Sequence, residues 1–434
     1  MLGRDHSRVV AILICGLMIF APASGFSTII TTAATTATTA KKKAPVRTSA
    51  RARAAARTAA AARTAASVHS APRTTVVATR VTREVHYYGV PTYANSAKDD
   101  VATFDDPTIR QAAIEGLGRY NGSVVAIDPN SGRILSIVNQ NLAFSSGFIP
   151  CSTIKPVIAV AALDESIITR DTMIEVAHRR YLNLVEALAH SNNAFFEELG
   201  RRMGFDTVER YARLLGVGEL SGYQIPQEQP GTLPSEPPKN GGVARMSSFG
   251  EGIQITPLQL ASLISTLANG GTMYYLQYPQ TPQEQEDFMP RVKRRLDIEA
   301  LLPDIRDGML AAVLYGTARR SDVGENEQWL GKTGTCSDSA SRLGWFVSYA
   351  DQAHPKLVLA VLTRGQSSSV KGSLSAEIAG RIYRRLYMEN YFAGASDSSK
   401  SPSAATPAAS VPASTTAPAA ASSIGAKADS RSGG

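Results

Sequence analysis

A serine and a lysine stand three positions apart in the middle of the chain, at Ser152 and Lys155. If this segment is helical, residues i and i+3 lie on one face, and the lysine amine lies next to the serine hydroxyl. A serine hydroxyl needs a neighbouring base to become a nucleophile. The dipole and free N–H groups at the start of a helix would also favour negative charge on the reacting oxygen. The pair therefore indicates acyl transfer through a covalent serine intermediate.

The spacing alone is weak evidence, because Ser368 and Lys371 repeat it in a segment that we interpret as a loop. Two further motifs strengthen the interpretation. The sequence Ser-Asn-Asn at 191–193 falls at a boundary between helical stretches, and Lys-Thr-Gly-Thr at 332–335 falls within an expected strand. The order of the three motifs along the chain matters more than any one of them.

In this order the chain resembles the transpeptidase domain of the penicillin-binding proteins, which are related to the serine β-lactamases. The resemblance covers roughly 122–387 and includes GSVVAIDPNSGRILSIV at 122–138, SFGEGIQITPLQLASLISTLANGG at 248–271 and GTA at 316–318. It implies that Ser152 is the acylated nucleophile and that Lys155 takes its proton. Ser191 and Lys332 would relay the proton to the departing amine.

The same resemblance implies a substrate-binding set. Its members are Asn193, Thr333, Gly334 and Thr335. The asparagine would hold the substrate amide, and the strand would lie antiparallel to the bound peptide with its two threonines near the terminal carboxylate. The backbone N–H groups of Ser152 and Thr335 would form the oxyanion hole. A glycine between the threonines would leave room for the peptide backbone.

Two cysteines flank the expected site and depart from the family pattern. Cys151 stands immediately before the serine, where the family usually has glycine, and Cys336 follows the Lys-Thr-Gly-Thr motif. We hypothesise that they form a disulfide in an oxidising exported compartment, which requires Cα atoms within about 7 Å. Buried free thiols are the alternative.

Strand signals occur at both ends of a central region. Segments 122–128 and 133–138 are typical of a hairpin, and strand-like runs recur at 329–336, 342–349 and 356–363. Helices are expected after Ser152, across 184–215, between a capping box at Thr256 and a stop at Asn269, at 298–315 and at 375–391, with a Pro-rich loop at 226–242. This pattern predicts an α+β fold, with an antiparallel sheet flanked by helices and an adjoining all-helical region.

Composition indicates one folded domain, 100–392, between two terminal segments of biased composition. A basic Ala/Thr/Arg-rich linker at 27–99 and an Ala/Ser/Pro-rich tail at 393–434 lack the apolar side chains for a core, and we expect both to be disordered. The net charge of +8 originates in the linker, because residues 27–83 hold 11 Lys or Arg and no acidic residue. The remaining 34 basic and 37 acidic residues give no reason to expect nucleic acid as a partner.

Residues 1–26 have the pattern of an export signal: two arginines precede an apolar run at 9–20 and Ala-Pro-Ala at 21–23. The run is short for a membrane-spanning helix, which needs about 20 residues. Cleavage after Ala23 and retention as an inner-membrane anchor therefore both stay open. Either way, we expect an exported protein that faces the periplasm.

Other kinds of site are disfavoured. With Cys15 in the signal, two cysteines and six scattered histidines offer no metal site, and we expect no cofactor. A phosphate-binding loop that ends at Lys332 would need glycine where Asn326 stands, and no GxSxG motif of an α/β-hydrolase occurs.

We therefore predict a serine D,D-transpeptidase that cuts the D-Ala-D-Ala bond of peptidoglycan stem peptides, cross-links stems and is inhibited by β-lactams. The alternatives are a D,D-carboxypeptidase, with water as acceptor, a class D-like β-lactamase, and a non-catalytic β-lactam sensor or scaffold. A class A β-lactamase is disfavoured because 226–242 contains no ExxLN segment, and a class D enzyme because Asn193 replaces an expected valine.

Overall fold

A computed structural model describes residues 89–324, 327–350 and 354–393, and all of them fall within one compact unit. The predicted signal at 1–26 and all of the predicted tail after residue 393 lie outside the described residues, as does the linker up to residue 88. Residues 89–99 of that linker belong to the folded unit, because the Ala94 N–H donates to the Arg119 carbonyl at 3.0 Å. The folded chain therefore begins before residue 100.

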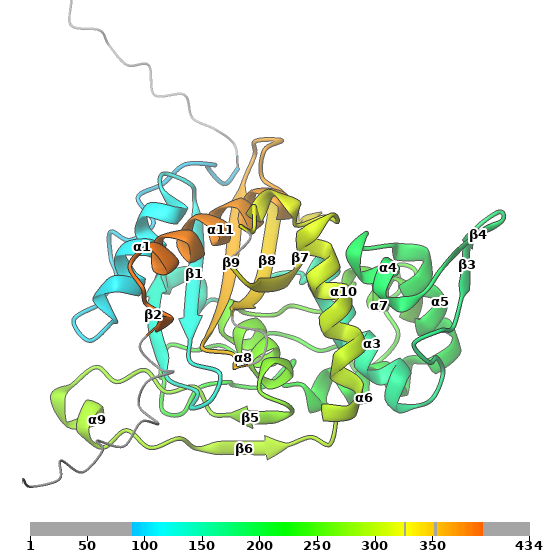
Figure 1. Ribbon diagram of the computed structural model, residues 1–434, viewed down its shortest axis with the longest axis horizontal. Coiled ribbons are helices and arrows are strands. Elements are labelled where there is room, and N and C mark those ends of the chain that lie inside the picture. Colours follow the sequence, from blue (N-terminus) through cyan, green and yellow to red (C-terminus); the bar gives the residue numbers. More distant parts are fainter. Residues whose placement is uncertain (1–88, 325–326, 351–353, 394–434) are drawn as a thin grey trace, which may run out of the picture. The chain divides into compact units, whose positions relative to one another are not determined.

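A five-stranded sheet runs through this unit (Figure 1). Its strands are β1 (Gly122–Ile127), β2 (Ile134–Val138), β7 (Trp329–Ser337), β8 (Arg342–Ala350) and β9 (Leu357–Gly365). The order is β2-β1-β9-β8-β7, and every neighbouring pair is antiparallel. The hairpin near the start of the domain thus pairs with strands from its end, as the sequence predicted. The strand with the Lys-Thr-Gly-Thr motif, β7, lies at an edge.

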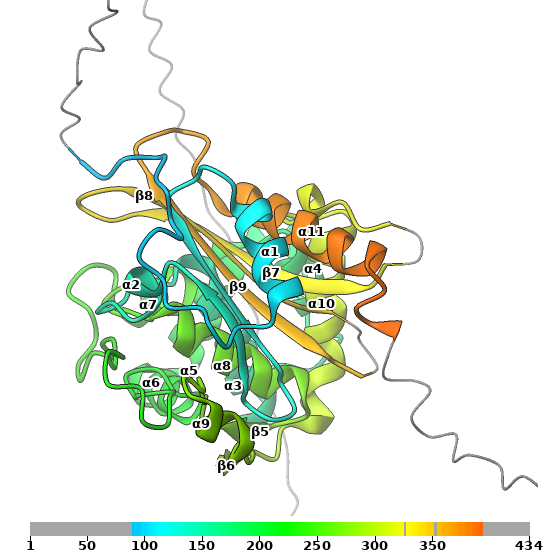
Figure 2. The same ribbon diagram turned by 90° about the vertical axis from the view of Figure 1, so that its left-hand side faces the viewer.

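Helices cover both faces of the sheet, which explains why its strands are apolar on both sides. Figure 2 shows α1 (Pro107–Leu117) and α11 (Gly372–Met388) on one face and α8 (Pro257–Ala268) on the other. Along β1, Val124 faces the core beneath α1 and α11, whereas Val125 faces the core that includes α8. The predicted α+β class is confirmed.

A helical region adjoins the β7 edge of the sheet (Figure 1). It comprises α3 (Lys155–Asp164), α4 (Leu184–Ala189), α5 (Asn193–Met203), α6 (Phe205–Leu214), α7 (Gly242–Phe249) and α10 (Leu302–Leu314). Helix α10 packs against both α4 and β7, so it joins this region to the sheet. The stretch 184–215 thus forms three helices, in agreement with the sequence analysis.

Several shorter elements were not predicted. They are α2 (Gln140–Ala143), α9 (Pro282–Glu286), the pair β3 (Ile174–Ala177) and β4 (Arg180–Leu182), the pair β5 (Thr272–Tyr274) and β6 (Val292–Arg295), and the 3-10 turn η4 (Arg319–Ser321). Helices α1 and α7 were also missed. The helix predicted at 298–315 is present and begins with a 3-10 turn, η3 (Glu299–Leu301). Isolated two-stranded ribbons of this length are marginal by themselves and depend on the surrounding fold, so local sequence signals them weakly.

Helix α8 begins with the predicted capping box. Thr256 Oγ1 accepts a hydrogen bond from the Gln259 N–H at 3.0 Å, and Gln259 Oε1 accepts one from the Thr256 N–H at 2.9 Å. The Gln259 amide also donates to the carbonyls of Glu219 and Pro230, both at 2.6 Å. All residues of α8 are buried, so the cap cannot be replaced by water. Gln259 therefore stabilises both the start of α8 and the loop that contains Glu219 and Pro230.

Thr256→Ala should lower the free energy of unfolding by about 1–2 kcal/mol, because it leaves the buried N–H of Gln259 without its acceptor. The matched control is Thr281→Ala, which removes the N-cap of α9, a helix with no buried residues. We expect that control to change global stability by less than about 0.5 kcal/mol, since exposed ends fray locally. Urea denaturation measures both, and equal losses would contradict this account of α8.

Candidate active site

Ser152 lies at the start of the predicted helix. It is the second residue of a 3-10 turn, η2 (Cys151–Ile154), which continues directly into α3. The serine is 9% exposed, whereas the Lys155 side chain is fully buried. Lys155 Nζ lies 2.7 Å from Ser152 Oγ, within hydrogen-bonding distance. The i, i+3 spacing therefore brings the amine and the hydroxyl into direct contact.

Lys155 Nζ also contacts the Ser-Asn-Asn motif. It lies 3.1 Å from the carbonyl oxygen and 3.2 Å from Oγ of Ser191, and it donates to Asn193 Oδ1 at 2.7 Å. Burial, followed by the charge of nearby Lys332, holds the pKa of Lys155 well below its ordinary value, although Glu197 opposes the shift. A neutral amine has two N–H donors and one lone pair. Lys155 can therefore donate to this motif and still accept the proton of Ser152.

The middle residue of the motif sets its geometry. Asn192 is the N-cap of α5 and accepts the Phe195 N–H at 2.9 Å, while its own N–H donates to the Ala187 carbonyl at 2.9 Å. Ser191 adopts a left-handed conformation, with φ of 53°. This tight connection between α4 and α5 directs the polar atoms of Ser191 and Asn193 toward Lys155.

Lys332 approaches the same serine from the sheet. Its side chain is fully buried in β7, and Nζ donates to Ser191 Oγ at 2.8 Å and to the Thr333 carbonyl at 2.9 Å. Burial lowers the pKa of Lys332 to about 7. The contacts run in one chain from Ser152 to Lys155, Ser191 and Lys332. The structure thus brings together the four residues predicted to be catalytic.

The two threonines of β7 are held by different elements. Thr333 Oγ1 donates to Thr317 Oγ1 at 2.7 Å, and Thr335 Oγ1 accepts the Gly372 N–H at the start of α11 at 2.8 Å. Thr335 is exposed, whereas Thr333 is buried. Both hydroxyls are thereby fixed at the free edge of the sheet.

Gly334 lies against the nucleophile's own turn. A Cβ atom at this position would stand 2.9 Å from the Pro150 carbonyl oxygen and 3.1 Å from Thr153 Cγ2. The family resemblance implies that this glycine leaves room for a bound peptide. The structure gives a further reason for glycine, because a side chain here would separate β7 from η2.

Thr317 is a site neighbour to which the sequence analysis gave no role. Besides its contact with Thr333, its N–H donates to the Ala189 carbonyl at 3.0 Å. The preceding Gly316 permits this approach, since a Cβ there would stand 2.2 Å from the same carbonyl. The signal was the GTA sequence at 316–318, which the family resemblance included without a function.

The hypothesised disulfide is present: Cys151 and Cys336 are bonded, with Cα atoms 5.7 Å apart. The bond joins η2 to β7. Nearby, Trp345 Nε1 donates to the Ile149 carbonyl at 3.0 Å, which adds a second link between the sheet and the segment before Ser152.

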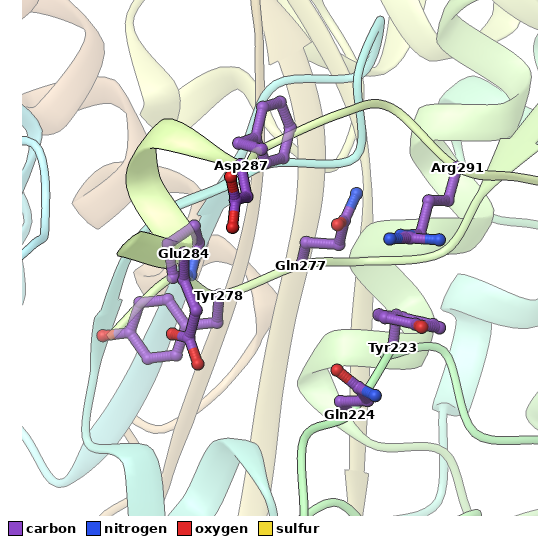
Figure 3. A pocket seen from close by; sticks show the side chains of 9 residues that line it. Tyr223, Gln224, Gln277, Tyr278, Glu284, Asp287 and Arg291 are labelled. Carbon is purple, nitrogen blue, oxygen red and sulfur yellow. The ribbon is translucent and has the colours of Figure 1, made fainter. Parts of the chain in front are cut away.

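A separate pocket of about 240 Å³ lies beside the segment that joins β5 to β6 (Figure 3). It is lined by Tyr223, Gln224, Gln277, Tyr278, Pro279, Glu284, Asp287, Phe288 and Arg291. The Arg291 guanidinium lies 4.2 Å from the centroid of the Tyr223 ring, and Gln277 Nε2 donates to the Met289 carbonyl at 2.8 Å. None of the lining residues belongs to the serine site.

Within the described residues, no group of three His, Cys, Asp or Glu could hold a metal ion.

Comparison with known proteins points to one family. A family model described as the penicillin binding protein transpeptidase domain matches residues 122–384. Stage V sporulation protein D of Bacillus subtilis is 28% identical over 315 residues, which cover 60% of this chain and 48% of that protein. Peptidoglycan D,D-transpeptidase MrdA of Haemophilus influenzae is 24% identical and is covered over 54% of its length. The chain thus spans about half the length of these curated relatives.

A solved structure with the same fold is that of penicillin-binding protein A from M. tuberculosis as a ceftriaxone acyl-enzyme complex. Its TM-score to this chain is 0.57 at 21% sequence identity, and the match covers 65% of this chain and 78% of that one. The D,D-transpeptidase domain of a peptidoglycan glycosyltransferase from Eggerthella lenta matches with a TM-score of 0.51.

Among the described residues, no helix is both long and apolar enough to cross a membrane.

The lowered pKa of Lys332 predicts a pH-dependent stability. Well above the ordinary lysine pKa of about 10.4, this lysine is neutral in both the folded and the unfolded chain, so it does not affect stability. As the pH falls toward 7, the unfolded chain gains this proton while the folded protein does not, and stability falls. Below about pH 7 both states hold the proton, and the loss stays constant at a few kcal/mol, from about 1.4 kcal/mol for each unit of pKa difference.

Lys332→Met should therefore gain stability relative to the wild type as the pH is lowered from about 10 to about 7. Urea denaturation at several pH values measures the difference. Lys98→Met, at an exposed position, is the control and should track the wild type. If the difference in the free energy of unfolding between the wild type and Lys332→Met did not change with pH, the pKa of Lys332 would not be lowered.

Proposed function

Because the chain belongs to the penicillin-binding protein transpeptidase family, we propose that it is a serine D,D-transpeptidase that acts on peptidoglycan stem peptides ending in D-Ala-D-Ala. The observation that most directly supports this activity is the 2.7 Å contact between Lys155 Nζ and Ser152 Oγ. The amine is buried and its pKa is lowered, so it loses its own proton more readily than an exposed lysine and can accept the serine proton. No metal or cofactor enters the proposed reaction.

In the first step, Lys155 takes the proton from Ser152, and the serine oxygen attacks the carbonyl carbon of the penultimate D-Ala. The carbonyl oxygen becomes negatively charged and is stabilised by the backbone N–H groups of Ser152 and Thr335. The position of Ser152 at the start of the η2 and α3 helical segment favours the same charge. A tetrahedral intermediate results.

The intermediate then collapses by breaking the peptide C–N bond. The terminal D-Ala leaves as an amine and needs one proton, which Ser191 Oγ supplies. Lys155 then passes the proton that it took from Ser152 to Ser191 Oγ, across a distance of 3.2 Å. Lys332 Nζ lies 2.8 Å from the same oxygen, on its other side. The stem peptide remains as an ester on Ser152.

The stem peptide binds along the free edge of β7 by adding a strand to the sheet. Thr333 and Thr335 bind its terminal carboxylate, assisted by the positive charge of Lys332 when protonated. Asn193 uses Oδ1 to accept from Lys155, which leaves its amide N–H groups to hold a carbonyl of the substrate backbone.

The second substrate decides the outcome. Attack by the side-chain amine of another stem on the ester forms a cross-link and makes the enzyme a transpeptidase. Attack by water would make it a carboxypeptidase. β-Lactams mimic the D-Ala-D-Ala terminus and acylate Ser152, and slow hydrolysis of that ester makes them inhibitors, whereas fast hydrolysis would make the protein a β-lactamase.

The substrate implies a place outside the cytoplasm, because peptidoglycan is cross-linked there. We infer that residues 1–26 direct export and that the domain faces the periplasm, either released after Ala23 or held at the inner membrane by the uncleaved segment. The basic segment at 27–83 then separates the domain from the membrane.

Ser152→Ala should abolish labelling of the purified protein by a fluorescent penicillin, because it removes the hydroxyl that forms the ester. Ser368→Ala is the matched control: it has the same SxxK spacing, but its serine is exposed in a loop, and we expect full labelling. Lys155→Ala should slow labelling by roughly 10²-fold or more, because it removes the base.

The course of the label over hours separates the candidate functions. A persistent label that depends on Ser152 supports the proposed class, and release of D-Ala from a stem pentapeptide then excludes a sensor. Fast loss of the label with turnover of the drug would instead indicate a β-lactamase. Labelling that survives Ser152→Ala would disprove the mechanism.

A further inference from the structure

We propose that the Cys151–Cys336 disulfide positions the nucleophile for acylation, by tying the turn that carries Ser152 to the strand that carries Thr335. The inference rests on the proposed function, because it concerns the rate at which Ser152 is acylated. The two cysteines are positioning residues, since they act through the backbone of their neighbours in sequence.

Each end of the disulfide is adjacent to one proposed oxyanion donor. Cys151 immediately precedes Ser152, and Cys336 immediately follows Thr335. The bond connects positions 185 residues apart in sequence and holds their Cα atoms 5.7 Å apart. The two N–H groups that must converge on one oxygen therefore belong to residues next to a single covalent link. Preorganised donors stabilise an oxyanion only when their mutual geometry is fixed before the reaction.

The backbone of Cys151 shows that this residue is held in its conformation. Its φ of 52° lies in the left-handed region, which glycine adopts readily and other residues avoid. This conformation begins the η2 turn and so orients Ser152. A cysteine here needs a restraint that glycine would not need, and the bond to β7 provides one.

The remaining links between η2 and the sheet are noncovalent. They include the hydrogen bond from Trp345 Nε1 to the Ile149 carbonyl at 3.0 Å and the close packing of Gly334 against Pro150. Cys151 is buried in the core around η2, and the partly buried Cys336 packs against that core; none of these contacts requires the disulfide bond. We therefore expect the reduced protein to stay folded while Ser152 loses its fixed position relative to Thr335.

The first test uses the full-length chain with Cys15→Ser, so that only these two cysteines remain, purified in detergent. A phosphine reductant donates two electrons and is oxidised to its oxide with oxygen from water, while the disulfide takes up two protons and becomes two thiols. Reduction should slow acylation by a fluorescent penicillin by roughly tenfold or more, since small misplacements of reacting groups have effects of this size. Reoxidation should restore the rate. Thermal unfolding must show that the reduced protein is folded at the assay temperature.

A pair of variants separates positioning from stability. Cys151→Ala with Cys336→Ala removes the cross-link and leaves an unfavourable φ, whereas Cys151→Gly with Cys336→Ala removes the same cross-link but restores a residue suited to that φ. The alanine variant should unfold at the lower temperature, because its unfavourable φ adds to the loss of the cross-link. The acylation rates are therefore compared at a temperature at which both variants are fully folded. Only a positioning role predicts that the glycine variant acylates several-fold faster than the alanine variant.

An unchanged acylation rate in folded, reduced protein would overturn the proposal. Equal rates in the two variants, with losses that follow the folded fraction, would also overturn it, as would mass spectrometry that finds both thiols free before reduction. A failure of the unreduced protein to label at all is a different result, because it contradicts the proposed function rather than the role of the disulfide.

Discussion

The site depends on the burial of two lysine amines beside two serine hydroxyls. Lys155 and Lys332 are both fully shielded from solvent, and none of the ion pairs among the described residues includes either of them. A charged amine that is buried without a carboxylate is costly, so the structure compensates by lowering the pKa and by giving the amines hydrogen-bond acceptors. Ser152, Ser191, Asn193 and the Thr333 carbonyl provide them. Burial therefore both lowers the pKa of the two lysines and holds these four groups in place around them.

These acceptors come from parts of the chain that are distant in sequence, and the rest of the fold brings them together. The turn η2 presents Ser152, the connection between α4 and α5 presents Ser191 and Asn193, and the edge strand β7 presents Lys332. Helix α10 packs against both α4 and β7, and Thr317, which follows it, bonds to Ala189 on one side and to Thr333 on the other. The helical region and the sheet thus meet at one set of hydrogen bonds. The disulfide adds a covalent link at the same junction.

The sequence predicted those features that depend on local spacing. The contact between Ser152 and Lys155 follows from i, i+3 geometry, and the cap of α8 follows from Thr256 and Gln259. The order of the three motifs indicated the family and, through it, the other residues of the site: Ser191, Asn193 and Lys332. Features that depend on tertiary contacts were harder to predict. The GTA sequence at 316–318 placed Thr317 in the family resemblance but did not indicate its bond to Thr333, and the proximity of Cys151 to Cys336 could only be hypothesised. The short ribbons β3–β4 and β5–β6 were missed because neighbouring elements, rather than their own residues, stabilise them.

The most direct test of the central claim is to trap the acyl-enzyme formed from a natural substrate. The full-length protein would be mixed with a stem pentapeptide ending in D-Ala-D-Ala, quenched in acid within seconds, digested and analysed by mass spectrometry. We predict release of one D-Ala per adduct and a stem tetrapeptide acyl group on the fragment that contains Ser152, localised to that serine. An adduct on another residue, or release of D-Ala that persists in Ser152→Ala, would contradict the account.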